Sequence, residues 1–213
     1  MKSPRVAVID YGVGNLLSVQ RGLESCGADV IISNKPDEIL KSDHVVLPGV
    51  GAFGNAMQAL EMLDLPSLVD EVVKQGKPFL GICLGMQLLL DESEEFGIHQ
   101  GLGLIAGKVQ AIPTHAISGE TLKIPHIGWN SLVEANNATW ENTCLHNNKS
   151  GDAMYFVHSF MANPYHQEHR LADCLYGSHR IAAVIKKDNI MGCQFHPEKS
   201  GILGLKILQE FLR

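Results

Sequence analysis

A cysteine stands between two glycines in the stretch PFLGICLGMQLLL, residues 78–90. A nucleophile on a tight turn from strand to helix needs small neighbours, and Gly81 and Gly85 supply them on either side of Cys83. Such a turn places the sulfur at a helix N-terminus, whose partial positive charge favours the thiolate. The backbone N–H group of Leu84 can then face a developing oxyanion. The alternative is a structural cysteine in a buried strand, so the interpretation as a nucleophile requires a base elsewhere in the chain.

The stretch QFHPEKS, residues 194–200, offers that base. Pro197 biases the residue before it toward extended backbone, so His196 and Glu198 project to the same side with Cα atoms about 6–7 Å apart. The carboxylate can hold one imidazole nitrogen and leave the other to take the thiol proton. Alone, the pair would indicate a solvated histidine and glutamate at a strand end. Together with Cys83 it predicts a Cys–His–Glu triad.

A glycine-containing loop, LPGVGAFG at 47–54, follows a predicted strand directly. Gly49 and Gly51 let backbone amides turn inward at the carboxyl edge of a sheet, where open α/β sheets bind their ligands. The loop could complete an oxyanion hole with Leu84, through the amide of Gly51 or of Val50. Glycine-rich loops of this kind are common, so the loop supports the triad without identifying it.

Composition narrows the class of protein. The chain has 213 residues and a net charge of −6, which gives no support to nucleic-acid binding or to an anionic membrane surface. No apolar run reaches the roughly 18 residues that span a bilayer. The five cysteines form no CxxC pair, and the first twelve residues do not have a signal-peptide pattern. We therefore expect free thiols in a reducing cytoplasm.

Two further motifs are set aside. GVGNLLS at 12–18 has Leu17 where a dinucleotide fingerprint needs a third small residue, and Asn15 is more simply a helix cap. HQEHR at 166–170 lies in a polar loop and lacks the zinc-protease pattern, so no metal site is expected. The chain order Cys, His, Glu also differs from the order of an α/β-hydrolase, in which the acid lies between nucleophile and histidine.

The elements that must position these residues alternate in the first half of the chain. Predicted strands at 5–9, 28–33, 44–49 and 78–82 alternate with helices near 15–27, 36–41 and 53–75, which indicates parallel strands with helices on both faces. The second half is an added β-rich region, with strands at 153–161, 180–187 and 189–197, the last two joined by a KDN turn. Ser200 can cap a closing amphipathic helix that carries Ile202, Leu205, Leu208 and Leu212. One α/β domain over residues 1–213 is the simplest reading.

The triad motifs GICLGMQLL and QFHPEKS together resemble the class I glutamine amidotransferase family, whose members hydrolyse the side-chain amide of glutamine and pass the ammonia to a synthase. Further stretches, DYGVGNLLSV (10–19), LPGVGAFG (47–54), KIPHIGWN (123–130) and YFVHSF (155–160), resemble the branch of glutaminase subunits that serve imidazole glycerol phosphate synthase. The resemblance covers essentially the whole chain.

The resemblance implies roles for further residues. Cys83 would be the nucleophile, His196 the acid and base, and Glu198 its orienting partner, with the oxyanion strand at 48–51. Other positions match residues that hold glutamine: Gln87, Glu95, His158, Ser159 and Phe160. Four more match a partner interface: Trp129, Lys199, Asn130 and Pro125. The stretch 135–150 has no feature to which a role can be given.

The activity that the resemblance implies needs neither a metal nor an organic cofactor. Its substrate is L-glutamine, and its partner is a cyclase subunit with a (β/α)8 barrel, which uses the ammonia in histidine biosynthesis. Two alternatives remain open at this point. One is a paralogous subunit that feeds another synthase, such as one aminating a surface sugar. The other is a non-catalytic glutamine-binding regulator, which an intact triad disfavours.

Overall fold

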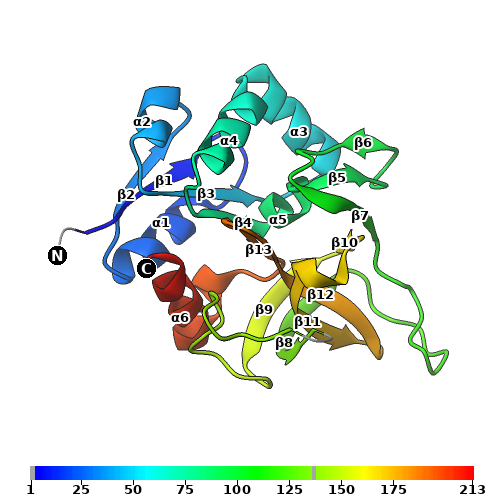
Figure 1. Ribbon diagram of the computed structural model, residues 1–213. Coiled ribbons are helices and arrows are strands. Elements are labelled where there is room, and N and C mark those ends of the chain that lie inside the picture. The colour runs from blue at the N-terminus through cyan, green and yellow to red at the C-terminus, as the bar shows by residue number, and fades with distance from the viewer. Residues whose placement is uncertain (1–2, 136–137) are drawn as a thin grey trace.

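A computed structural model describes residues 3–135 and 138–213 of the chain (Figure 1). Residues 136–137, within the stretch 135–150, and residues 1–2, within the opening stretch, lie outside the described residues. The described chain contains a nine-stranded sheet, whose strands in spatial order are β2 (Asp29–Ser33), β1 (Arg5–Ile9), β3 (His44–Gly49), β4 (Phe79–Cys83), β13 (Ile190–Cys193), β12 (His179–Lys187), β11 (Arg170–Tyr176), β8 (His126–Glu134) and β9 (Ala153–His158).

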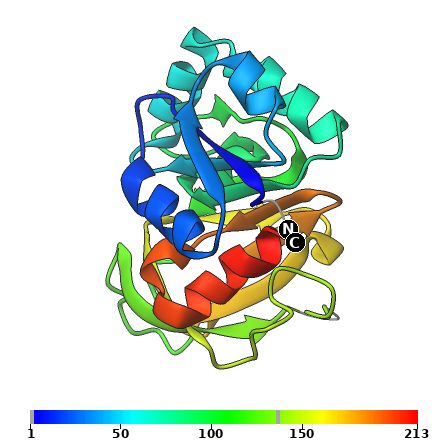
Figure 2. The same cartoon turned by 90° about the vertical axis from the view of Figure 1, so that its left-hand side faces the viewer.

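The first five strands of this order pair in parallel. The alternating sequence predicts this for β2, β1, β3 and β4, whereas β13 comes from the second half of the chain and joins them beside β4. Helices α1 (Leu16–Ser25) and α6 (Gly201–Phe211) cover one face (Figure 2), and α2 (Pro36–Leu40), α3 (Phe53–Met62) and α4 (Leu65–Lys74) cover the other. Strand residues alternate between the two cores: Val6 and Val8 pack toward α1 and α6, whereas Ala7 and Ile9 pack toward the other helices. Burial of both faces explains why these strands are almost entirely apolar.

The helical stretch predicted at 53–75 is two helices. Helix α3 ends at Met62, and Asp64 adopts a left-handed backbone with φ 53° before α4 begins. The apolar periodicity continues through this turn, because both helices bury one stripe against the same face of the sheet.

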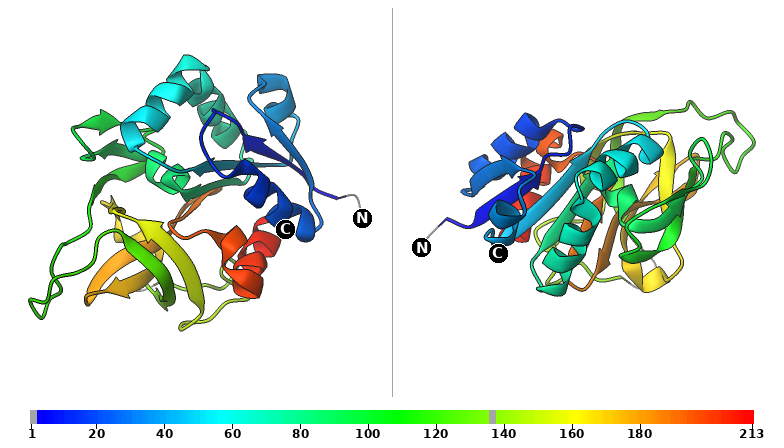
Figure 3. Two further views of the ribbon diagram at one scale, coloured as in Figure 1. Left: turned by 180° about the vertical axis from the view of Figure 1, so that it is seen from behind. Right: turned by 90° about the horizontal axis from the view of Figure 1, so that it is seen from above.

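The second half of the chain supplies antiparallel strands. β12 and β13 form the predicted hairpin, with Lys187 paired to Ile190, and β11, β8 and β9 extend the sheet from it. A smaller four-stranded sheet has the order β10 (Phe160–Pro164), β7 (Ile105–Ala111), β5 (Leu90–Ser93) and β6 (His99–Gln100). The loop between β7 and β8 extends away from both sheets (Figure 3).

The segment predicted as one strand at 153–161 is divided between the two sheets. β9 belongs to the large sheet and ends at His158, and β10 belongs to the small sheet and begins at Phe160. Ser159 is the residue at which the chain passes from one sheet to the other. The single-strand prediction was wrong because the run of β-forming residues continues through the change of partner.

Two details of the helices differ from prediction. Ser200 and Asn15 occupy the N-cap positions of α6 and α1, but neither side chain makes a capping hydrogen bond. On α6, Ile202 is 78% exposed, and the buried face is instead formed by Gly204, Ile207, Leu208 and Phe211. None of the helices in the described residues is long and apolar enough to cross a membrane.

Candidate active site

Cys83 lies on the strand-to-helix turn that its glycines predict. It is the last residue of β4, and α5 (Leu84–Leu88) begins directly after it. Its backbone has φ 57° and ψ −111°, a strained conformation for a residue with a side chain. A Cβ atom on Gly85 would lie 1.8 Å from the carbonyl oxygen of Leu47, and one on Gly81 would lie 2.6 Å from the carbonyl oxygen of Gly85. The flanking glycines are therefore required by close backbone contacts.

His196 and Glu198 form the predicted pair beside the thiol, but the predicted extended segment was wrong: β13 ends at Cys193, and Pro197–Lys199 form a 3₁₀ helix with His196 at its N-cap. Nδ1 of His196 lies 2.8 Å from Oε1 of Glu198, and the two side chains are 4% and 0% exposed. Burial lowers the pKa of His196, but its interactions with Cys83 and Glu198 outweigh burial and raise that pKa to about 9. At neutral pH the imidazole therefore carries a proton.

Two contacts from outside the triad fix the position of this pair. The hydroxyl of Ser200 donates to the carbonyl of His196 and accepts from the N–H group of Tyr155, so the predicted helix cap ties the triad segment to β9. Gly22 of α1 lets that helix approach Glu198, because a Cβ atom there would lie 3.0 Å from the Cβ of Glu198. The triad thus rests on contacts between distant parts of the chain.

The candidate oxyanion loop lies next to the nucleophile. Gly49 is the register partner of Cys83 in the parallel pairing of β3 with β4, and Gly51 has φ +95°. The buried hydroxyl of Tyr11 donates to the carbonyl of Pro48 over 2.9 Å, which anchors the start of the loop. Burial, and secondarily the charge of Cys83, raises the pKa of Tyr11, so the hydroxyl remains a donor. Val50 is 40% exposed at the tip of the loop.

A cavity of about 190 Å³ opens on the thiol. That volume is below the range of drug-sized pockets and suits a small metabolite. Most of the residues that the sequence singled out as the nucleophile or as substrate or oxyanion contacts line this cavity: Gly51, Cys83, Leu84, Gln87, Glu95, His158, Ser159 and Phe160. Its wall also contains Val157 and Pro125, which was expected at the partner interface.

Two polar side chains in the cavity wall use some of their polar atoms in hydrogen bonds to other protein groups. Gln87 donates through Nε2 to the carbonyl of Phe160 and to Oε1 of Gln194, which leaves its own Oε1 as the atom free for a ligand. Oε2 of Glu95 accepts the N–H group of Phe53 at the start of α3, over 2.6 Å. The second oxygen of Glu95 gives the cavity a carboxylate suited to an ammonium group.

Trp129 and Asn130, expected at a partner interface, lie on β8, and Pro125 directly precedes that strand, whereas Lys199 lies in the 3₁₀ helix Pro197–Lys199. Trp129 is 60% exposed, and Lys199 and Pro125 are also exposed. Asn130 is half-buried, and its amide donates within the chain, to the carbonyl of Leu175 and toward His126.

Three buried residues near the site were missed in the sequence: Tyr11, His126 and Gln194. His126 and Gln194 each stand between two apolar residues, and that contrast is the signal that could have found them, whereas Tyr11 follows Asp10 and shows no such signal.

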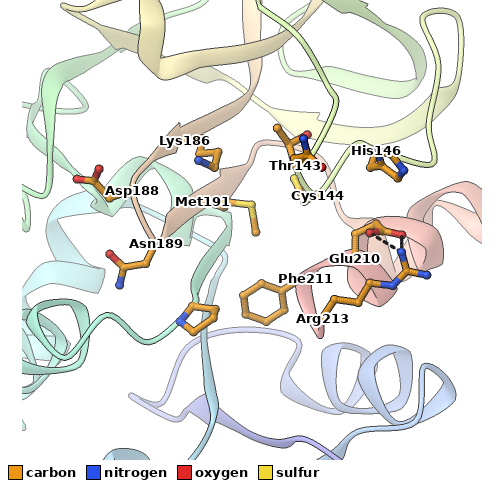
Figure 4. A pocket seen from close by; sticks show the side chains of 12 residues that line it. Thr143, Cys144, His146, Lys186, Asp188, Asn189, Met191, Glu210, Phe211 and Arg213 are labelled. Carbon is orange, nitrogen blue, oxygen red and sulfur yellow. Dashed lines mark hydrogen bonds and ion pairs between the residues drawn. The ribbon is translucent and has the colours of Figure 1, made fainter.

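A second cavity, of about 470 Å³, has none of the triad residues in its wall (Figure 4). Its wall includes Pro78, which precedes β4, whereas Cys83 ends that strand, so the two cavities open at opposite edges of the sheet. The cysteine in this wall is Cys144, and burial raises its pKa to about 12. The described residues hold no group of three or more His, Cys, Asp or Glu side chains placed to bind a metal ion.

The sequence matches the family described as glutamine amidotransferase class I over residues 7–213. This chain therefore belongs to the class I glutamine amidotransferases. Solved structures agree on the fold: PurLQS from Thermotoga maritima superposes with a TM-score of 0.74 at 20% identity, covering 99% of this chain and 98% of that one. A structure described as a glutamine amidotransferase gives a TM-score of 0.70 at 15% identity, covering 97% and 98%.

Similar sequences of named proteins point to one branch of this class. The imidazole glycerol phosphate synthase subunit HisH 1 of Legionella pneumophila (strain Lens) is 52% identical over 209 residues, covering 98% of each chain. The subunit HisH of Bacillus subtilis (strain 168) is 45% identical, covering 98% of this chain and 95% of that protein. Within the class, the chain is similar to HisH subunits over nearly its full length.

Proposed function

We propose that this protein is the glutaminase subunit of an imidazole glycerol phosphate synthase. The observation that carries the proposal is the strained Cys83 turn beside the buried His196–Glu198 pair, opening on a cavity of amino-acid size. The identity of 45–52% to HisH subunits supports the assignment to this branch.

In the proposed reaction glutamine lies with its ammonium group toward the free oxygen of Glu95 and its side-chain amide at Cys83. The thiolate attacks the amide carbon, and N–H groups of Leu84 and of the 49–51 loop hold the oxyanion. His196 then protonates the departing nitrogen, which leaves as ammonia, and a thioester remains. Water deprotonated by the neutral His196 attacks the thioester, and glutamate leaves with the thiol restored.

Ammonia must then reach an acceptor. We propose a cytoplasmic complex with a (β/α)8-barrel cyclase, which adds ammonia to a phosphoribulosyl-formimino imidazole-carboxamide intermediate. The products are imidazole glycerol phosphate and aminoimidazole carboxamide ribonucleotide. Trp129 and Ile127, which are 60% and 55% exposed on β8, supply an apolar surface for the contact.

The test compares Cys83→Ser with Cys144→Ser, a substitution of a buried thiol in the other cavity. Glutamate release in the presence of the cyclase should be lost in the first variant and retained in the second, and both should still bind the cyclase. An electrophilic glutamine analogue should label Cys83 alone in the wild type. Labelling at another cysteine with Cys83 unmodified would overturn the assignment of the nucleophile.

A further inference from the structure

A continuous set of polar contacts runs from the exposed side of β8 to the sulfur of Cys83. Asn130 contacts His126 over 3.3 Å, and His126 Nδ1 lies 2.9 Å from His158 Nε2. Nδ1 of His158 lies 2.8 Å from the carbonyl oxygen of Phe160.

The set continues on the other side of that oxygen. The carbonyl of Phe160 also accepts from Nε2 of Gln87, over 3.0 Å. Nε2 of Gln87 donates in addition to Oε1 of Gln194 over 2.9 Å, and Nε2 of Gln194 lies 3.9 Å from Sγ of Cys83. Gln194 is completely buried.

The backbone carbonyl of Phe160 sets the direction of the hydrogen bonds in this set, both toward His158 and toward Gln87. The oxygen of Phe160 can only accept, so the NH2 group of Gln87 must face it. The second hydrogen of that group then requires an acceptor, which turns Oε1 of Gln194 toward Gln87. The NH2 group of Gln194 is left facing the sulfur. On the other side, Nδ1 of His158 must donate to Phe160, so its Nε2 accepts from His126.

The sulfur of Cys83 therefore has two opposed polar neighbours besides the triad. The carbonyl of Val157, at 3.9 Å, accepts only from the protonated thiol. The N–H group of Gln194, also at 3.9 Å, can donate to the thiolate. Removal of the Gln194 amide would leave the Val157 carbonyl facing the sulfur with no opposing donor outside the triad, which favours the thiol.

We propose that Gln194 is a positioning residue for the nucleophile: its amide, oriented by Gln87 through the carbonyl of Phe160, donates to Cys83 and stabilises the thiolate. This inference rests on the proposed function of Cys83. Gln194 does not line the cavity, so its contribution should affect reactivity of the sulfur and leave glutamine binding nearly unchanged. The titratable groups around Cys83 are His196 and Tyr11 and, in the wall of the same cavity, Glu95 and His158. All four remain in place when Gln194 is changed.

The test measures the alkylation rate of Cys83 by iodoacetamide between pH 5 and 10, resolved by peptide mass spectrometry. In Gln194→Met the side chain keeps its length and loses the donor. We expect the midpoint of the pH profile to rise by about one unit, so that alkylation at pH values below the wild-type midpoint slows by up to about tenfold. With cyclase present and at the same pH, kcat for glutamine hydrolysis should fall by a similar factor, and KM should change less than twofold.

Gln194→Glu provides the second variant, since it keeps an acceptor for Gln87 and places a carboxyl group toward the sulfur. It should raise the midpoint at least as far as Gln194→Met, and it decides the question if the methionine variant does not fold. Gln75→Met, at an exposed glutamine of the α4 C-terminus, is the matched control and should leave the profile unchanged.

The outcomes separate this inference from the proposed function. Midpoints in both Gln194 variants that match the wild type would overturn the role of Gln194 and leave the triad intact. A wild-type Cys83 that is not alkylated faster than the other cysteines near neutral pH would overturn the proposed nucleophile, and with it the positioning role.

Discussion

Acidification should destabilise the protein through His158. Burial, opposed by its hydrogen bond to the carbonyl of Phe160, lowers the pKa of His158 to about 4. In the unfolded chain a histidine titrates near about 6.5. The native state therefore binds fewer protons between these values, so the stability contribution is full above pH 6.5 and is lost as pH falls toward 4.

The loss can be worked out from the two pKa values. With about 4 in the native state and about 6.5 in the unfolded state, the free energy of unfolding at pH 5 is lower by about 2 kcal/mol than at pH 7. His196 acts in the opposite direction, because its raised pKa of about 9 makes its contribution full below pH 6.5 and lost as pH rises through 9. A comparison of variants removes this second effect.

The assay is urea unfolding at pH 7 and pH 5 for the wild type and His158→Asn. The asparagine amide can replace Nδ1 as the donor to Phe160, and it does not titrate. A buried histidine away from His158, such as His44, titrates in both proteins. The variant should lose about 2 kcal/mol less than the wild type on going from pH 7 to pH 5. An equal loss in both proteins would refute the reasoning.

Three other predictions concern the site. Glu198→Gln should keep the hydrogen-bond geometry, lower the pKa of His196 from about 9 and move the alkaline limb of the glutaminase pH profile to lower pH; an unmoved limb would contradict the role of Glu198. Gly85→Ala should cost more than about 3 kcal/mol of stability in urea unfolding, because its Cβ would meet the Leu47 oxygen at 1.8 Å. The control Gly76→Ala, whose Cβ would have no atom within 4 Å, should cost about 1 kcal/mol. Glutamate release should rise when the cyclase binds and rise again when the cyclase is loaded with acceptor, and Trp129→Ala should weaken this activation; a constant rate would contradict it.

The sequence predicts the triad because the necessary information is local. Gly81 and Gly85 lie two residues from Cys83, and His196 and Glu198 lie two residues apart, so each group is close along the chain. The extended backbone predicted for the second pair was wrong, because Glu198 lies in a 3₁₀ helix at Pro197–Lys199. The parallel half of the fold is equally local, since each buried strand is a short apolar run followed by a helix.

The rest of the site depends on contacts between distant residues. Gln194 meets Gln87 across 107 positions and His126 meets His158 across 32, and no spacing rule indicates either contact. Ser200 reads as a helix cap, but its hydroxyl is used by Tyr155 and His196. At such positions tertiary partners outcompete the local preference of the side chain.

The passage of the chain between sheets at Ser159 has a consequence for regulation. A molecule in the cavity touches Cys83, at the end of β4 in the large sheet, and Glu95, just after β5 of the small sheet. A bound molecule therefore connects the two sheets at the place where they meet. A protein bound over β8 and β9 that shifts one sheet against the other must change the affinity for glutamine, and glutamine must change the affinity for that protein by the same factor.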